Sequence, residues 1–128
     1  MRNLKILLIS ILFLAPAFTC FSQVKQSNEV KMYYFHFTRR CATCIAVEEE
    51  SKKAITELYG DKVSFLSVNL EEDEGMKKGE NLGISGQTLL IVSGDNKINI
   101  TNEGFMNARS NPEKLKQIIK DKMDPLVN

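Results

Sequence analysis

The sequence predicts a single α/β domain with the element order β-α-β-α-β-β-α. Short runs rich in aromatic and β-branched residues alternate along the chain with segments whose apolar residues recur every three or four positions. Turn-forming residues separate these segments, and the sequence contains no internal repeat and no low-complexity tract. A chain of 128 residues leaves room for one such domain and little more.

The first 22 residues are predicted to be an export signal. Arg2 and Lys5 supply a short positive start, and residues 6–18 are almost entirely apolar. This apolar run is too short to cross a bilayer comfortably as a helix, and no stop-transfer pattern follows it. We expect cleavage after Ser22. Acylation of Cys20 is the alternative, although the residues before it match a lipoprotein signal poorly.

Cleavage would leave an exported domain of residues 23–128. This domain loses two of the 17 basic residues and none of the 16 acidic ones, so its formal charge is −1. A nearly neutral domain gives no electrostatic reason to expect binding to nucleic acid or to an anionic membrane. Two of the three cysteines remain, and an oxidising compartment would let them cycle between dithiol and disulfide.

The domain is expected to open with a strand and a long helix. Residues 30–37 are rich in aromatic side chains and nearly continuous in apolar character, which suits a strand buried on both faces. From Cys41 onward, apolar and small residues repeat at helical spacing, and Gly60 ends that pattern. The expected inward face of this helix comprises Cys44, Val47, Ser51, Ala54, Ile55 and Leu58.

The rest of the chain supplies three strands and two helices. A second strand is expected over residues 63–70, followed by an acidic loop and a short helix around residues 76–82. Residues 87–92 are expected to form a third strand, which a Ser-Gly-Asp-Asn turn joins to a fourth near residues 98–101. The last helix is predicted to begin at Asn111, a capping residue followed by proline. Its apolar stripe comprises Leu115, Ile118, Ile119 and Met123.

The chemistry is expected at Cys41 and Cys44, three positions apart at the start of the first helix. At the helix N-terminus, unpaired backbone N–H groups and the helix dipole favour the thiolate of Cys41. Arg39 and Arg40 directly before it add positive charge and are expected to tune its pKa. Cys44 falls on the inward face. We therefore expect Cys41 to attack a partner's disulfide and Cys44 to resolve the mixed disulfide.

Three alternatives to redox exchange stay open. A purely structural disulfide is weakly favoured, because so short a loop contributes only about 2 kcal/mol. A metal-binding or carrier module is the stronger alternative, although two cysteines supply half of a zinc site and the single histidine, His36, lies in the first strand. Copper-carrying domains also place such a pair before a helix, but their order is β-α-β-β-α-β. A redox-inert accessory subunit could keep the fold for a partner interface.

A family resemblance is carried by three segments in succession. They are Cys41-Ala42-Thr43-Cys44 between a strand and a helix, Val68-Asn69-Leu70, and Gly83-Ile84-Ser85-Gly86 leading into Thr88-Leu89-Leu90. Together they resemble the thioredoxin family over nearly all of residues 30–123. The resemblance implies a thioredoxin-like fold, with a central mixed four-stranded sheet flanked by three helices. It also implies Cys41 as nucleophile and Cys44 as resolving thiol.

A narrower resemblance lies in the segment 34–41, Tyr-Phe-His-Phe-Thr-Arg-Arg-Cys. This segment resembles small exported bacterial thioredoxin-like proteins that carry an ArsF-type nitroreductase-subunit label. The label by itself says little about what such a protein does, and no reductase activity is inferred from it.

Three departures from the thioredoxin pattern bear on the site. Arg40 stands where the family has a tryptophan, and Phe35 stands where it has a buried acid. The cis-proline that faces the disulfide is missing, and Gln87 or Thr88 takes its place. A cis bond without proline costs about 3 kcal/mol, so we expect a trans peptide there. The departure weakens the expected grip on substrates and gives the metal alternative some support.

The function predicted from the sequence is thiol–disulfide exchange with protein thiols or disulfides, in a thiol–disulfide oxidoreductase without metal or cofactor. Gln87 and Thr88 are expected to face the two sulfurs. His36 could be a ligand or base but more often such a residue is a hydrogen-bonded packing residue. The acidic run 71–74 lacks the ligand spacing of a calcium loop and is expected to be solvated. The oligomeric state has no sequence signal.

Overall fold

The computed structural model describes residues 28–127, so the predicted signal segment lies outside the described residues. The strands are β1 (Val30–His36), β2 (Ser64–Asn69), β3 (Thr88–Ser93) and β4 (Asn96–Asn99). The helices are α1 (Ala42–Tyr59), α2 (Asp73–Leu82), α3 (Thr101–Asn107) and α4 (Pro112–Val127), with a short 3-10 turn, η1 (Gly60–Lys62), after α1. No helix within residues 28–127 is long and apolar enough to span a membrane.

The four strands form one mixed sheet in the order β2-β1-β3-β4. Strand β1 pairs in parallel with β2 and antiparallel with β3, and β4 pairs antiparallel with β3. The central position of β1 agrees with its sequence, because a strand with neighbours on both edges and cover on both faces needs apolar residues throughout. The register places Phe35 between Val68 and Thr88. The predicted mixed four-stranded sheet is confirmed.

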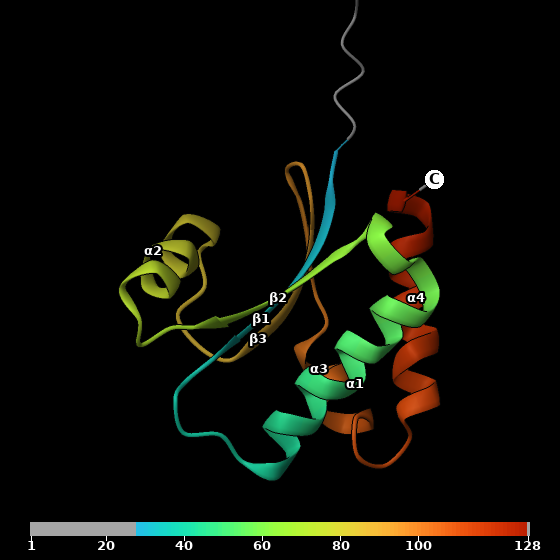
Figure 1. Cartoon of the computed structure of the whole chain (residues 1–128), viewed down its shortest axis with the longest axis horizontal. Coiled ribbons are helices and arrows are strands. Elements are labelled where there is room, and N and C mark those ends of the chain that lie inside the picture. The colour runs from blue at the N-terminus through green and yellow to red at the C-terminus, as the bar shows by residue number, and fades with distance from the viewer. Residues whose placement is uncertain (1–27, 128) are drawn as a thin grey trace, which may run out of the picture.

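The helices divide unequally over the two faces of the sheet. Helices α1, α3 and α4 cover one face, and α2 covers the other (Figure 1). Alternate residues of β1 serve the two faces: Met32 and Tyr34 join the larger core under α1, α3 and α4, whereas Tyr33 and Phe35 join a smaller core on the α2 side. The side-chain alternation of a strand explains this division. The expectation that β1 is buried on both faces is confirmed.

A fourth helix replaces the end of the fourth strand that the sequence predicted at residues 98–101. Strand β4 ends at Asn99, whose Oδ1 accepts hydrogen bonds from Thr101 N at 3.0 Å and from Thr101 Oγ1 at 2.6 Å. This turn starts helix α3. A Cβ at Gly104 would lie 3.1 Å from Leu89 Cδ2, so the glycine lets α3 lie directly on the core. The prediction of three helices was therefore one short.

The remaining helix boundaries follow local chemistry. Helix α2 begins at Asp73, three residues earlier than the predicted helix, and places Asp73 and Glu74 in its first turn, where the helix dipole favours carboxylates. Helix α1 ends at Gly60, which has a φ of 54°. Helix α4 is capped as predicted, since Asn111 Oδ1 accepts a hydrogen bond from Lys114 N at 3.1 Å.

Candidate functional site

Cys41 is the N-cap residue of α1. Its backbone is extended, with φ −77° and ψ 166°, and its Sγ accepts a hydrogen bond from Cys44 N at 3.2 Å. Its carbonyl accepts the first intrahelical bond, from Ile45 N at 3.1 Å. The sulfur of Cys41 therefore takes the place that a serine or aspartate oxygen usually takes at a helix start.

Cys41 and Cys44 are joined by a disulfide, with their Cα atoms 5.1 Å apart. The two residues differ in exposure: Cys41 is exposed, whereas Cys44 is 3% exposed and belongs to the buried face of α1. An incoming protein sulfur can therefore reach Cys41 and is screened from Cys44. The assignment of Cys41 as nucleophile and Cys44 as resolving thiol stays a prediction, to which this difference in exposure is relevant.

Gln87 lies beside the buried sulfur, with its Oε1 3.6 Å from Cys44 Sγ. Thr88 is the first residue of β3, is 7% exposed, and donates its hydroxyl to Gly86 O at 2.9 Å. All peptide bonds of residues 28–127 are trans. Of the two residues that the sequence placed near the sulfurs, Gln87 contacts one of them through its side chain, whereas the hydroxyl of Thr88 is committed to its own loop.

The two arginines before Cys41 are in different surroundings. Arg39 is exposed. Arg40 forms an ion pair with Glu48, two turns along α1, and the side chains of both are less than a third exposed. The carboxylate of Glu48 offsets part of the charge that Arg40 was expected to supply to Cys41. The pKa-tuning role of the arginines stays a prediction, and the structure adds Glu48 as a residue that opposes it.

Tyr34 is a buried neighbour of this ion pair that sequence reasoning took only as core. Burial raises the pKa of its phenol, and the charge of Arg40 lowers it in part. The side chain is fully buried, and neither Tyr34 OH nor Ser51 Oγ has a hydrogen-bond partner among residues 28–127. The signal for Tyr34 was its parity in β1, which places it on the α1 face of the sheet.

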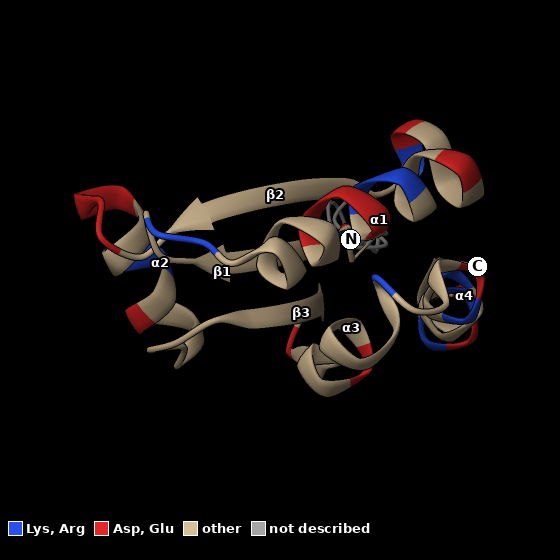
Figure 2. Ribbon diagram, turned by 90° about the horizontal axis from the view of Figure 1, so that it is seen from below, with Lys and Arg blue, Asp and Glu red and all other residues tan. Residues whose placement is uncertain are grey.

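The loop between β1 and Cys41 is fixed to the end of β2. Thr38 N donates to Glu71 Oε2 at 2.6 Å, and Asn69 Nδ2 donates to Thr38 Oγ1 at 3.0 Å. Hydrogen bonding from Thr38, first from its side chain and then from its backbone, lowers the pKa of Glu71. Figure 2 shows the basic segment before α1 and the acidic turn before α2 at the same end of the molecule. The acidic run therefore contributes one exposed carboxylate to holding the loop that leads to Cys41.

His36 is a hydrogen-bonded packing residue, which is one of the two roles considered for it from the sequence. It is 8% exposed, its Nδ1 lies 2.9 Å from Phe37 O, and its Nε2 lies 2.9 Å from Ser67 Oγ. A carbonyl only accepts, so Nδ1 carries the proton and Nε2 accepts from the serine hydroxyl. Among the described residues, no group of three or more His, Cys, Asp or Glu side chains is placed to hold a metal ion.

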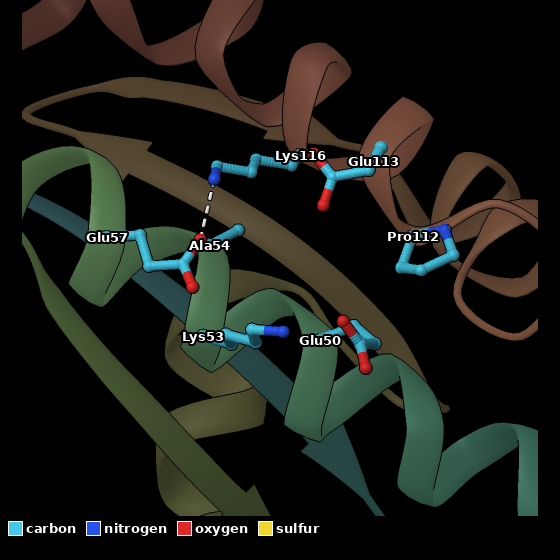
Figure 3. A pocket seen from close by; sticks show the side chains of 7 residues that line it. All are labelled: Glu50, Lys53, Ala54, Glu57, Pro112, Glu113 and Lys116. Atoms are coloured by element: carbon cyan, nitrogen blue, oxygen red, sulfur yellow. Dashed lines mark hydrogen bonds and ion pairs between the residues drawn. The ribbon is translucent and has the colours of Figure 1, made fainter.

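The hollow between α1 and α4 is too small for a substrate site. It has a volume of about 10 Å³, room for one water molecule at most. Figure 3 shows its charged lining, in which Lys116 Nζ lies 2.6 Å from Glu57 Oε2. A larger hollow of about 190 Å³ lies between β2 and α2, beside Tyr33, Leu66 and Lys78. Neither is lined by the two cysteines or by Gln87.

Comparison with known proteins gives a match at the level of structure. No protein-family model and no curated protein matches the chain. Thioredoxin O2 from Arabidopsis thaliana, in its oxidized state, matches with a TM-score of 0.52 and 16% sequence identity over 79% of this chain and 77% of that chain.

Thioredoxin f2 from Chlamydomonas reinhardtii matches with a TM-score of 0.52 and 21% identity over 79% of this chain and 85% of that chain. Neither match bears on the nitroreductase-subunit resemblance, which stays a prediction. At these identities the likeness concerns the fold. The chain has a thioredoxin-like fold, with a cysteine pair at the start of its first described helix, as the sequence predicted.

Proposed function

We propose that the protein is a thiol–disulfide oxidoreductase that exchanges disulfides with protein partners through Cys41 and Cys44. The observation that carries the proposal is the disulfide between an exposed N-cap cysteine and a buried first-turn cysteine. A disulfide that closes so short a loop adds little stability, so exchange chemistry explains this cysteine pair better than a contribution to folding does.

The exchange runs in two balanced steps. The Cys41 thiolate attacks one sulfur of a partner's disulfide, which forms a mixed disulfide and releases the partner's other sulfur as a thiolate. Cys44 then attacks Cys41 Sγ, which restores the Cys41–Cys44 disulfide and releases the partner's second thiol. Two electrons pass from the protein to its partner, and the reverse sequence oxidises a partner dithiol.

The backbone at the start of α1 supports the first step. Cys44 N donates to Cys41 Sγ at 3.2 Å, and this bond strengthens when the sulfur carries negative charge. The positive end of the helix dipole acts in the same direction. Both effects favour a Cys41 thiolate near neutral pH, which is the form that attacks.

Protein partners are the proposed substrates because the reactive sulfur lies at the surface and apolar side chains are exposed near it in the chain. Phe37 is 36% exposed and Ile45 is 41% exposed, on either side of Cys41 in the sequence. Export to the bacterial periplasm is part of the proposal and rests on the first 22 residues. In that compartment a two-sulfur site can cycle without a cofactor.

A metal-binding or carrier module is the second candidate, and the contact at Cys44 is the observation that bears on it. Gln87 could add an amide oxygen to two thiolates, but this set is short of the four ligands that zinc prefers. Both nitrogens of His36 are engaged elsewhere. The redox-inert accessory subunit is tested by replacing both cysteines, because partner binding would survive.

Trapping of mixed disulfides tests the proposed function. Cys44→Ser should accumulate mixed disulfides with exported proteins through Cys41, and Cys41→Ser, the matched control, should trap almost none. Non-reducing electrophoresis with mass spectrometry reads the result. Equal trapping by both variants, or none by either together with stoichiometric metal in the purified parent, would contradict the proposal.

A further inference from the structure

We propose that Gln87 is a positioning residue that holds the reduced Cys44 as a neutral thiol, because its amide oxygen accepts a hydrogen bond from the S–H group. The inference rests on the proposed function, because it concerns the state of the resolving sulfur during exchange. It assigns a specific task to one of the two residues expected where the thioredoxin pattern has proline. The argument uses the placement of the side chain, the redox state of the sulfur and the burial of both.

The position of Gln87 is set by the sheet. It directly precedes β3, and the next residue, Thr88, is paired with Phe35 of β1. Cys44 is fixed independently, because it lies on the buried face of α1 and is 3% exposed. The 3.6 Å between Gln87 Oε1 and Cys44 Sγ therefore joins two separately anchored elements. Thr88 does not compete for the sulfur, since its hydroxyl donates to Gly86 O.

The contact changes character with the redox state of the sulfur. In the disulfide, Cys44 Sγ carries no hydrogen, so the amide oxygen beside it accepts nothing from it. Reduction by two electrons and two protons gives Cys44 a thiol hydrogen, which can then be donated to Gln87 Oε1. The hydrogen bond therefore exists in the reduced protein alone. It adds to the stability of the reduced state and leaves the oxidised state without an equivalent bond.

The same bond separates the behaviour of the two sulfurs. A hydrogen bond donated by a neutral group favours the neutral form, and burial acts in the same direction on Cys44. Cys41 has the opposite environment, because a backbone N–H points at its exposed sulfur. After reduction the first sulfur is prepared to lose its proton and the second to keep it. Premature attack by Cys44 is thereby restrained until a partner is bound at Cys41.

Resolution of the mixed disulfide then requires that the held proton leave. Cys44 Sγ bonds to Cys41 Sγ, the bond between Cys41 and the partner breaks, and the thiol proton of Cys44 passes to the departing partner sulfur. Gln87 accepts a hydrogen bond but not the proton, because a carboxamide is not basic at neutral pH. It thus sets the rate of this step without taking part in the electron transfer.

The test replaces the acceptor while keeping the shape of the side chain. Gln87→Met removes the amide, and Gln117→Met, at an exposed position of α4, is the matched control. We expect Gln87→Met to lower the pKa of the Cys44 thiol, which 13C NMR of labelled cysteine measures. We also expect it to shift the thiol–disulfide equilibrium about fivefold toward the disulfide, or about 20 mV toward a more reducing potential. Gln87→Glu should move the thiol pKa upward, because a carboxylate disfavours a nearby thiolate.

The outcomes separate this inference from the proposed function. A Cys44 thiol pKa in Gln87→Met equal to that of the parent and of Gln117→Met would overturn it. So would a rise in that pKa, since a rise means that the amide N–H group faces a thiolate instead. If Gln87→Met shifts the pKa as expected but the parent exchanges no disulfides, the inference stands and the proposed function fails. If the parent exchanges and the variant shifts nothing, the inference alone fails.

Discussion

The two ends of helix α1 are held by contacts of different kinds. At the N-terminal end, Cys41 caps the helix, and the sulfur of Cys44 lies against Gln87. At the C-terminal end, Tyr59 OH donates to Asp124 Oδ1 at 2.7 Å, and Lys116 Nζ lies 2.6 Å from Glu57 Oε2. The contacts of the first end depend on the oxidation state of sulfur, and those of the second do not.

This difference separates chemistry from scaffold within one helix. The C-terminal end is fixed to α4 by charged and phenolic groups, which a thiol–disulfide cycle leaves unchanged. The N-terminal end of α1 has the exposed sulfur and lies near α3 (Figure 1). Changes at one end should therefore alter exchange with little effect on stability, and changes at the other should do the reverse.

The largest expected effect is the loss of exchange in Cys41→Ser. Serine is a good N-cap, so the free energy of unfolding of the variant should stay within about 0.5 kcal/mol of that of the reduced parent. Reduction of a protein disulfide, followed by thiol release, should fall to background. Urea unfolding under reducing conditions supplies the stability. A large loss of stability would show that the sulfur itself holds the helix end.

The opposite end is tested by Tyr59→Phe, which removes the hydrogen bond to Asp124. We expect a loss of about 1 kcal/mol in the free energy of unfolding and an unchanged rate of exchange. Cys44→Ser in the same assay should give the reverse pattern. If Tyr59→Phe slowed exchange as strongly as it lowered stability, the two ends of α1 would be coupled and the separation above would be wrong.

Acid should weaken contacts at both ends of α1, because the pKa values of Glu71 at one end and of Glu57 and Asp124 at the other are all lowered, so a single substitution is needed to distinguish the ends. Hydrogen bonds from Thr38 hold the pKa of Glu71 below its usual value. A lowered folded-state pKa gives stability that is present above the unfolded pKa and is lost as pH falls through the folded one. The loop before Cys41 should therefore loosen as the pH falls below the ordinary glutamate pKa, about 4.3, and through the lowered pKa of Glu71. Glu71→Gln should show the loosened loop already at neutral pH, as faster amide hydrogen exchange at Thr38, with exchange in the second half of α1 unchanged.

The sequence predicted the sheet, the capped helices and the cysteine pair because each has a short-range signal. Three features can be predicted from residues that are close together in the chain: the burial of β1 on both faces, the cap at Asn111 and the spacing of Cys41 and Cys44. Helix α3 was missed because apolar Ile98 and Ile100 alternate like a strand. The turn that ends β4 depends instead on the two hydrogen bonds that Asn99 Oδ1 accepts from Thr101.

The parts of the site that the sequence did not predict depend on contacts between residues that are separated along the chain. Glu48 lies outside the inward face that was predicted for α1, and its ion pair with Arg40 requires the loop to fold back on the helix. Gln87 could be placed near the sulfurs only through the family resemblance. Which of Gln87 and Thr88 contacts Cys44 depended on the hydrogen bond that turns Thr88 toward Gly86.

The smallest expected effect concerns the arginines and sharpens the account of the N-terminal end. Arg40 is paired with Glu48, so its charge acts on Cys41 only in part. Arg39→Ala together with Arg40→Ala should raise the pKa of the Cys41 thiol and slow alkylation near neutral pH. Glu48→Gln should do the opposite, by about half a pKa unit, because the guanidinium is then no longer offset.

Alkylation rate against pH measures both changes, with Lys122→Ala at an exposed position of α4 as the control for net charge. High salt should shrink each shift, since both rest on the interaction of partly exposed charges. If Glu48→Gln and the double arginine variant moved the Cys41 thiol pKa in the same direction, the ion pair would act by holding the loop in place. The helix N-terminus alone would then account for the thiolate, because it supplies Cys44 N as a donor to Cys41 Sγ whatever the charge on the loop.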